Sequence, residues 1–350
     1  MSRFLKDRYA ALEAYTPGEQ PRDMDYIKLN TNESPYPPAP AVVAAMSGEQ
    51  VENLRLYSDP TAKGLKEKLA ALYGLKESNI FLSNGSDDIL NFAFMAYGQN
   101  GAIFPDITYG FYPVFGDLHG VEYEEITLKE DFTINYEEYF GKNKLIVIAN
   151  PNAPTGISLP LSAIEGILKS NPDGVVVIDE AYVDFGGVSC YQLIERYENL
   201  LVCRTFSKSR CLAGGRLGYA FGSPALIADL EKIKYSTNPY NINRLTLLLG
   251  EATVEAERYY QEKCAAIIET RTQTAKALEG LGFEVLPSDA NFLFARHPKV
   301  GGEALYLALK EKGILVRHFR KERIKEFNRI TIGTPEQMQK MIEIIKEIIQ

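Results

Sequence analysis

The sequence is poor in the residues that build several common kinds of site. Its 350 residues include three histidines, four cysteines and no tryptophan. So few histidines do not favour a histidine-rich metal centre or a serine–histidine triad, and we predict no metal at the functional site. GxxxxGK[ST], GxGxxG, GxSxG and HExxH motifs are also missing. The cysteines lack CxxC spacing and are too sparse for a disulfide framework, which predicts reduced thiols in the cytoplasm.

Positive charge and long apolar runs are limited as well. The formal net charge is −8 and no basic block occurs, which argues against nucleic acid as a partner. No apolar run reaches the roughly 18 residues that span a bilayer. The first residues, MSRFLKDRYAALEAY, lack the apolar segment of a signal peptide. We therefore expect a cytoplasmic protein with small-molecule partners and no membrane or nucleic-acid partner.

Short β-branched or aliphatic runs alternate with helix-length segments between residues 79 and 221. Several runs, such as LIVIA and VVVID, are apolar throughout, which is typical of strands buried on both faces. Residues 87–97, 161–170 and 191–198 have helical spacing and fill the gaps. The pattern predicts an α/β fold with a mainly parallel seven-stranded sheet, whose strands are Asn79–Ser83, Ala102–Phe104, Val121–Ile126, Leu145–Ala149, Val175–Asp179, Leu200–Thr205 and Leu217–Phe221.

The two ends of the chain follow a different pattern. Prolines in TNESPYPPAP, residues 31–40, forbid a regular helix or central strand. A long helical stretch covers 244–280, and an α+β pattern follows it. We predict a large domain of residues 46–255 and a small domain made of residues 1–45 with 256–350.

Lys208 is a candidate catalytic residue because it directly follows a predicted buried strand, in RTFSKSRCLAGGR. The carboxyl ends of such strands are where α/β sheets place ligand sites. Thr205, Ser207 and Arg216 supply hydroxyls and a guanidinium that could bind one phosphate. Taken alone, Lys208 could equally be a solvated surface lysine.

Three other strand ends carry polar residues. Asp179 ends the VVVID strand, and Tyr182 lies three residues later; alone, Asp179 could be a helix N-cap. The turn NPNAPTG, residues 150–156, follows the LIVIA strand. In LSNGSDDIL, the free N–H groups of Gly85, Ser86 and Asp87 at a helix start form an anion cradle. Tyr109 begins the next helix and could stack on a planar ligand.

These motifs, in this order, resemble the fold-type-I pyridoxal-phosphate-dependent aminotransferases and, more narrowly, the histidinol-phosphate aminotransferase branch. The resemblance covers nearly the whole chain and rests on KLNTNESPY, LYSDP, NGSDDIL, the Asn/Pro/Gly turn, DEAY, TFSK with AGGR, YNIN, GILVR and RITIGT. It implies the fold-type-I architecture, pyridoxal 5′-phosphate as cofactor, and a homodimer with shared active sites.

The resemblance also implies roles for individual residues. Lys208 would bind the cofactor covalently, Asp179 would pair with its pyridinium nitrogen, and Tyr182 would contact its phenolic oxygen. Tyr109 would stack on the ring. Where the family has asparagine before Pro-Thr-Gly, this chain has Ala153, so Asn152 is the nearest amide. The cofactor phosphate would be held by Gly85, Ser86, Asp87, Thr205, Ser207, Arg216 and, from the neighbouring subunit, Tyr57.

Substrate recognition would fall to the two ends of the chain. The resemblance implies that Arg329 and Arg317 bind a carboxylate or a dianionic tail, and that Asn32 and Glu33 belong to an arm that covers the site. The implied reaction converts histidinol phosphate and 2-oxoglutarate into imidazole acetol phosphate and glutamate, in histidine biosynthesis. The alternatives are an aromatic amino acid aminotransferase, a threonine-phosphate decarboxylase of the same fold, and a catalytically silent binding module.

Overall fold

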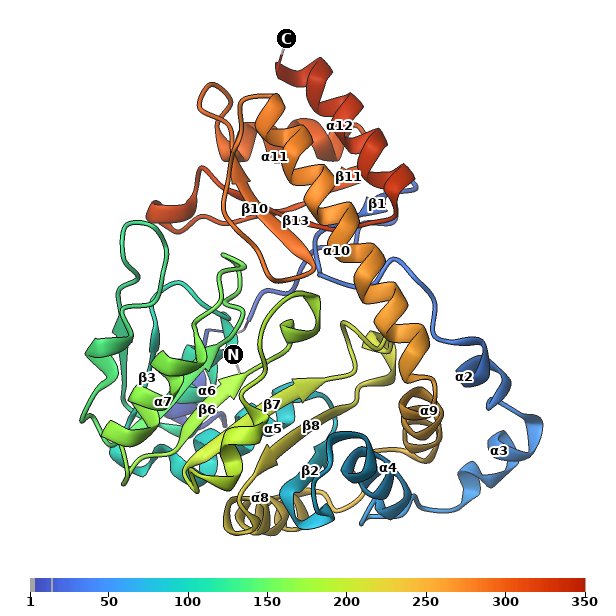
Figure 1. The fold of residues 1–350 in the computed structure, drawn as a ribbon, viewed down its shortest axis with the longest axis vertical. Coiled ribbons are helices and arrows are strands. Elements are labelled where there is room, and N and C mark those ends of the chain that lie inside the picture. The colour runs from blue at the N-terminus through green and yellow to red at the C-terminus, as the bar shows by residue number, and fades with distance from the viewer. Residues whose placement is uncertain (1–3, 14, 350) are drawn as a thin grey trace.

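A seven-stranded sheet forms the centre of the larger part of the molecule (Figure 1). The computed structural model describes residues 4–13 and 15–349. The strand order is β2-β8-β7-β6-β5-β3-β4, and β8 runs antiparallel to both of its neighbours while the other pairs are parallel. The predicted sheet is thus confirmed, with the strands β2 Ile80–Ser83, β3 Ala102–Pro105, β4 Tyr123–Ile126, β5 Leu145–Ala149, β6 Val176–Asp179, β7 Leu200–Thr205 and β8 Gly218–Gly222.

Helices cover both faces of this sheet because successive strand residues point to opposite sides. Phe81, Val177 and Leu201 pack against one layer of helices: α5 (Ser86–Tyr97), α6 (Phe111–His119) and α8 (Pro224–Thr237). Leu82 and Ile178 pack against the other layer: α4 (Lys63–Tyr73), α7 (Leu161–Ser170) and α9 (Arg244–Glu255). Burial on both faces explains why the central strands are apolar throughout.

A smaller α+β part stands above the large sheet in Figure 1. Its antiparallel sheet has the order β12-β13-β10-β9, and β1 pairs with β11 beside it. A separate apolar core lies between these strands and the helices. The division at residues 45 and 255 stays a prediction. The elements are β1 Ile27–Lys28, α10 Glu257–Gly280, β9 Glu284–Val285, β10 Phe292–Arg296, α11 Gly302–Glu311, β11 Ile314–Leu315, β12 Arg317–His318, β13 Asn328–Thr331 and α12 Pro335–Ile349.

Two predicted helices differ from the observed ones. The stretch 244–280 is two helices, because α9 ends and α10 begins at Ala256, where the backbone leaves helical geometry. The first helix packs on α4 of the large part and the second on α12 of the small part, so the chain turns between two bodies. Residues 191–198 form only a 3₁₀ turn, Tyr191–Glu195, since β7 already begins at Leu200.

The N-terminal arm carries only short elements. Besides β1 they are α1 Asp7–Ala10 and α2 Pro40–Ala44, and α3 Gly48–Glu52 follows directly after the arm. Pro40 occupies the first turn of α2, where a missing N–H costs nothing. The segment with α2 and α3 projects at the side of the molecule in Figure 1. Within the described ranges, no helix has both the length and the apolar character needed to cross a bilayer.

Candidate active site

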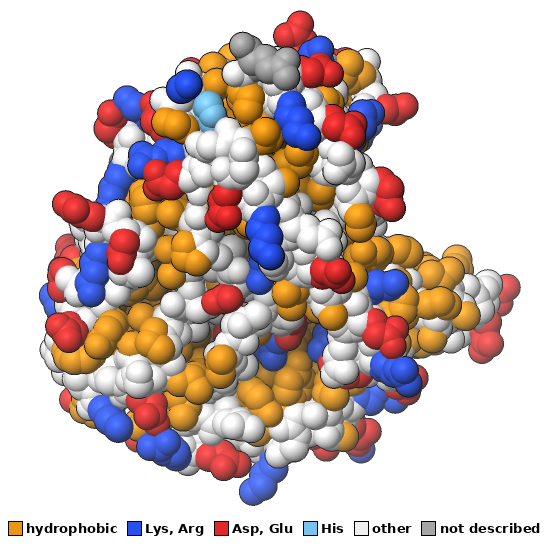
Figure 2. Space-filling model, turned by 45° about the horizontal axis from the view of Figure 1, so that its top comes forward, with side chains coloured by type: hydrophobic (Ala, Val, Ile, Leu, Met, Phe, Trp, Pro, Cys, Tyr) orange, Lys and Arg blue, Asp and Glu red, His pale blue; other side chains and the backbone are white. Residues whose placement is uncertain are grey.

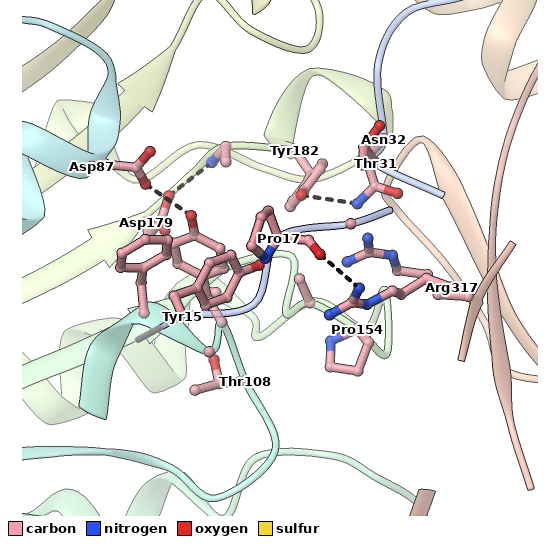
Figure 3. Close-up of a pocket in the computed structure, with 18 of the residues that line it drawn as sticks. Tyr15, Pro17, Thr31, Asn32, Asp87, Thr108, Pro154, Asp179, Tyr182 and Arg317 are labelled. Carbon is pink, nitrogen blue, oxygen red and sulfur yellow. Dashed lines mark hydrogen bonds between the residues drawn. The ribbon is translucent and has the colours of Figure 1, made fainter. Parts of the chain in front are cut away.

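A cavity of about 740 Å³ opens at the carboxyl ends of the central strands. Its walls come from both parts of the chain and from the N-terminal arm. In Figure 3 the carboxylates of Asp87 and Asp179 lie on one side and Arg317 on the other, with Pro17 between them. Most predicted site residues line it: Asn32, Glu33, Ser86, Asp87, Tyr109, Asp179, Tyr182, Thr205, Ser207, Lys208, Arg216, Arg317 and Arg329.

Asp179 is a nearly buried carboxylate, 5% exposed, at the end of β6. Its Oδ1 accepts a hydrogen bond from the backbone N–H of Ala181 (3.2 Å), and its Oδ2 accepts one from the hydroxyl of Tyr112 (3.0 Å). Loss of hydration raises the pKa of Asp179 to about 6, although both hydrogen bonds act to lower it. Among the described residues no lysine or arginine forms an ion pair with it, so this carboxylate lacks a cationic partner.

Lys208 faces the same cavity from the turn after β7, the strand next to β6. Its Nζ donates a hydrogen bond to the carbonyl of Thr31 (3.1 Å) and lies 5.8 Å from the centre of the Tyr182 ring. The structure therefore brings the amine and the buried carboxylate to one cavity from adjacent strands, as the sequence predicts.

Buried charges fix the turn that carries Lys208. The next residue, Ser209, donates its hydroxyl hydrogen to Asp184, which also pairs with Arg204 on β7. Arg210 pairs with Glu257 at the start of α10. Desolvation opposes ionisation of Asp184, but the neighbouring arginines outweigh it and hold its pKa below the ordinary value.

An anion cradle lies at the start of α5. Gly85 has a φ of +82°, and a Cβ on it would meet the Arg216 guanidinium at 2.7 Å. Arg216 Nη2 donates a hydrogen bond to Asp87 Oδ2 (3.1 Å). The guanidinium thus lies at the start of α5, where the first backbone N–H groups of the helix can bind an anion. Beside the cradle, Thr205 pairs in register with Gly218, the neighbour of Gly85, and the hydroxyls of Thr205 and Ser207 are joined by a hydrogen bond of 3.0 Å.

Two predicted aromatic residues flank the space between the cradle and Lys208. The Tyr109 hydroxyl donates to Asp87 Oδ1 (2.8 Å), and burial together with Asp87 raises the pKa of Tyr109 far above its ordinary value. The Tyr182 hydroxyl accepts from the amide of Asn32 (3.0 Å), a contact drawn in Figure 3. Asn32 has a φ of +57°, a conformation that asparagine tolerates better than most residues.

The two predicted substrate arginines are direct cross-strand neighbours. Arg317 on β12 pairs in register with Arg329 on β13. Arg329 donates to the carbonyl of Asn30 (2.9 Å), and its Nε is buried without a hydrogen-bond partner among the described residues. Arg317 donates to the carbonyls of Thr16 and Pro17, at 3.3 and 3.4 Å. Like charges opposite each other are unfavourable, so this pair favours an anionic ligand.

Glu33 is held away from the arginines. Its carboxylate pairs with Lys28 at 2.7 Å and accepts a hydrogen bond from the Thr31 hydroxyl at 2.8 Å. Burial alone would raise the pKa of Glu33, but these partners lower it below the ordinary value. Glu33 therefore braces the arm that carries the Thr31 carbonyl, to which Lys208 donates.

Three predicted residues do not line this cavity, and one of them is Gly85, the residue just before α5. The amide of Asn152 donates to the carbonyl of Ile107 (3.0 Å) and the hydroxyl of Thr155 (3.1 Å), so it stabilises its own turn, while Ala153 lines the cavity. Asn32 supplies the amide beside Tyr182 instead. Tyr57 is 79% exposed and stacks on Tyr240 with ring centroids 4.5 Å apart, outside the cavity of its own chain.

Three residues in or beside the cavity were not predicted from the sequence. Tyr15, from the arm, lines the cavity with its ring 4.2 Å from that of Phe111. Tyr112 on α6 donates its hydroxyl hydrogen to Asp179, whereas Tyr109, predicted to begin this helix, lies just before it, because α6 starts at Phe111. Lys321 donates to the carbonyl of Asp106 (2.6 Å) at the cavity wall. No sequence pattern indicated Tyr15, because the residues around it show no motif that relates the arm to the sheet.

Comparison with known proteins defines the class. The model of the family "Aminotransferase class I and II" matches residues 24–345, so the chain belongs to this family, and the predicted class of enzyme is confirmed. A histidinol-phosphate aminotransferase of Brachyspira hyodysenteriae is 49% identical, with 100% of each chain covered. One from Marinomonas sp. is 51% identical, covering 99% of this chain and 100% of the relative.

A solved structure supports the fold. Histidinol-phosphate aminotransferase from Sinorhizobium meliloti, in complex with pyridoxal-5′-phosphate, superposes with a TM-score of 0.89 at 22% identity. The match covers 100% of this chain and 98% of the other. The architecture predicted from the strand pattern is therefore that of the fold-type-I enzymes.

Proposed function

We propose that this aminotransferase uses pyridoxal 5′-phosphate to convert histidinol phosphate and 2-oxoglutarate into imidazole acetol phosphate and glutamate, in histidine biosynthesis. The observation that carries the proposal is the meeting of Lys208 and Asp179 in one cavity, from the ends of adjacent strands. Relatives named histidinol-phosphate aminotransferase, 49% and 51% identical over essentially full length, support the choice of amino donor.

The residues of the cavity fit pyridoxal phosphate. A buried carboxylate without a cationic partner suits the protonated ring nitrogen, and the cradle of Gly85 and Arg216 suits the phosphate. The amine of Lys208 suits the aldehyde. When bound, the cofactor supplies a conjugated ring that accepts the electrons released when a bond at the substrate Cα breaks. In our assignment the remaining cofactor contacts come from Ser86, Asp87, Tyr109, Tyr182, Asn32, Thr205 and Ser207.

The protein side chains bind, orient and move protons. Lys208 Nζ would serve as the general base that removes a proton from the substrate Cα and carries it within the cavity. The carboxylate of Asp179 would hold a cationic ring nitrogen by its negative charge. The Asn32 amide donates to the Tyr182 hydroxyl and so fixes the direction in which that hydroxyl can donate. Tyr15 and Pro17 of the N-terminal arm line the cavity.

Arg317 and Arg329 bind the anionic tail of either substrate. Their guanidiniums stand on paired strands with no carboxylate ion pair among the described residues, so a dianion would relieve the repulsion between them. The same pair serves the phosphate of histidinol phosphate in one half-reaction and a carboxylate of 2-oxoglutarate or glutamate in the other.

We further propose a cytoplasmic homodimer with shared active sites. Figure 2 shows apolar side chains gathered on a projection of the molecule, the segment that contains α2 and α3. Such a contiguous apolar surface suits a second copy of the chain. Tyr57 follows α3 in this projecting segment and would reach the active site of the partner subunit. All four cysteines are free thiols, in keeping with a reducing compartment. The exposed apolar residues are Val43, Met46, Val51, Leu54, Leu56 and Tyr57.

The variant Lys208→Ala tests the catalytic assignment. We expect loss of multiple turnover and of the visible absorbance of the cofactor-bound enzyme, because no amine would remain to bind the aldehyde. Lys169→Ala, at an exposed lysine of α7, is the control and should keep both properties. A Lys208→Ala enzyme that retained the absorbance and multiple turnover would rule the assignment out.

A panel of amino donors tests the substrate. With 2-oxoglutarate as acceptor, kcat/KM for histidinol phosphate should exceed that for phenylalanine and tyrosine. A preference for the aromatic amino acids would instead identify an aromatic amino acid aminotransferase. Release of carbon dioxide from threonine phosphate, without formation of glutamate, would identify a decarboxylase. Absence of every reaction in a cofactor-loaded protein would leave a binding module.

A further inference from the structure

Tyr112 contacts the Asp179 carboxylate from a position that the proposed function does not use. Its side chain is fully buried on α6, and its hydroxyl donates to Asp179 Oδ2 at 3.0 Å. Edge-on contacts with Phe104 and Tyr109, at centroid separations of 5.8 and 5.7 Å, hold the ring in place. Burial and the adjacent carboxylate raise the pKa of Tyr112 well above its ordinary value, so the phenol stays a hydrogen-bond donor.

Asp179 has few sources of stabilisation for its negative charge. The other donor is a backbone N–H at 3.2 Å, from Ala181. The neighbouring charges, Asp87 and Glu180, both act against ionisation. The strand on one side contributes Cys203, whose own pKa is raised by burial and by Asp179, so it adds no positive charge. Within the described residues, the Tyr112 hydroxyl is therefore the principal side-chain donor to this carboxylate.

We infer that Tyr112 is a positioning residue of the proposed reaction, which holds Asp179 ionised and aimed at the ring nitrogen of the cofactor. The inference rests on the proposed function, because it needs a cationic ring nitrogen opposite the carboxylate. Hydrogen bonds to charged groups are among the stronger ones in proteins, so loss of the donor should be measurable. The carboxylate would then take up a proton more readily and would also be free to rotate.

The experiment compares two variants that each remove one buried oxygen. Tyr112→Phe deletes the donor to Asp179. Tyr139→Phe is the matched control, since Tyr139 is fully buried and its hydroxyl has no partner among the described residues. Pyridoxal phosphate is titrated into each apoenzyme and its dissociation constant is read by fluorescence. We expect the constant to rise about tenfold or more in Tyr112→Phe and less than about twofold in the control.

Steady-state kinetics give a second measurement. Tyr112→Phe should lower kcat while KM for the amino donor changes less than about twofold, because the contacts with the donor are untouched. The pH dependence of the cofactor absorbance should shift in Tyr112→Phe and stay unchanged in Tyr139→Phe. Identical behaviour of the two variants would overturn the inference. Failure of the wild type to bind the cofactor or to transaminate would instead overturn the proposed function.

A double-mutant cycle with Asp179→Asn separates positioning from packing. If Tyr112 acts through the charge of Asp179, Tyr112→Phe should have almost no further effect on cofactor affinity in the Asp179→Asn background. Additive losses would show a role in packing alone and overturn the inference. If Tyr112→Phe does not fold, 3-fluorotyrosine at position 112 keeps the shape and strengthens the donor. It should then tighten cofactor binding, and weaker or equal binding would contradict the inference.

Discussion

Asp179 shows at the scale of one residue how burial alone changes ionisation. The side chain is 5% exposed, and loss of hydration raises its pKa to about 6. In an unfolded chain the pKa of aspartate is about 3.9. Between these two values the folded protein without cofactor binds a proton that the unfolded chain has already released. The folded state therefore loses stability as the pH rises from about 4 through 6.

This linkage predicts the behaviour of Asp179→Asn without cofactor. Near pH 7.5 the variant should be more stable than the wild type by up to about 3 kcal/mol, since it carries no buried charge. The difference should shrink as the pH falls toward 4.5. Urea unfolding of the apoenzyme at several pH values measures it. Asp173→Asn, at an exposed aspartate, is the control and should follow the wild type. A difference that does not vary with pH would contradict the prediction.

Site residues could be predicted from the sequence where they directly follow a predicted strand. Lys208 and Asp179 follow buried strands, and parallel strands place such residues at one edge of the sheet. The amide beside Tyr182 could not be found in this way. Asn152 is close to the site in sequence, but its amide is used by Ile107 and Thr155. Asn32 reaches Tyr182 only through the course of the arm, which the sequence did not determine.

The start of α5 allows a prediction at the scale of one element. Gly85→Ala places a Cβ 2.7 Å from the Arg216 guanidinium and forces a non-glycine residue to a φ of +82°. We expect Arg216 to be displaced and the affinity for pyridoxal phosphate to fall by about tenfold or more, because a charge-assisted contact to the phosphate is lost. Equilibrium titration of the apoenzyme with the cofactor measures this change.

Gly74→Ala is the matched control for the cradle. Gly74 has a φ of +68° at the end of α4, and a Cβ there would have open space. Gly74→Ala should cost about 1–2 kcal/mol of stability through its left-handed backbone conformation, and Gly85→Ala, at a φ of +82° and a ψ of 168°, about 1–3 kcal/mol. Only Gly85→Ala should also weaken cofactor binding. Equal loss of affinity in both variants would attribute the effect to general destabilisation rather than to the cradle.

At this scale the sequence predicted strands better than helix ends. All seven strands of the large sheet occur close to their predicted places, and the signal is strongest for β5, β6 and β7, which are buried on both faces, whereas the edge strand β4 is largely polar and exposed. The break between α9 and α10 at Ala256 leaves no signal in the sequence, since residues on either side favour a helix. Packing of the two helices on different parts of the molecule decides it.

A whole-molecule prediction concerns the shared active sites. If Tyr57 serves the partner's site, a Lys208→Ala chain and a Tyr57→Ala chain can complement each other. Their heterodimer has one site with both changes and one site with neither. Co-expressed and purified through two different tags, it should recover activity approaching half that of the wild type per dimer. Each homodimer alone should show the defect of its own variant.

The outcome that contradicts shared sites is equally clear. If Tyr57 acted within its own chain, the heterodimer would contain one site of each defective kind and would not exceed the mean of the two homodimers. The substitution Tyr235→Ala, at another partly exposed tyrosine, gives a control chain for the mixing. Paired with Lys208→Ala, it gives the activity expected of a heterodimer that has one working site.

The sequence predicted the overall architecture of the molecule but not its details. Alternation of strands and helices gave the α/β class, and the family match and the observed sheet agree with it. The approach of the N-terminal arm to the cavity could not be foreseen. Contacts such as Arg317 with the carbonyls of Thr16 and Pro17 join residues about 300 positions apart and involve backbone atoms, which carry no side-chain signal.

The antiparallel strand β8 has a consequence for the newly made protein. A Cβ on Gly218 would meet the backbone carbon of Gly85 at 2.4 Å, so the cradle rests directly on β8. These residues are more than 130 positions apart in the chain. During synthesis the cradle therefore lacks its support until the ribosome has passed residue 222, and contacts this distant in sequence form slowly. We therefore expect pyridoxal phosphate to bind only after β8 has joined the sheet.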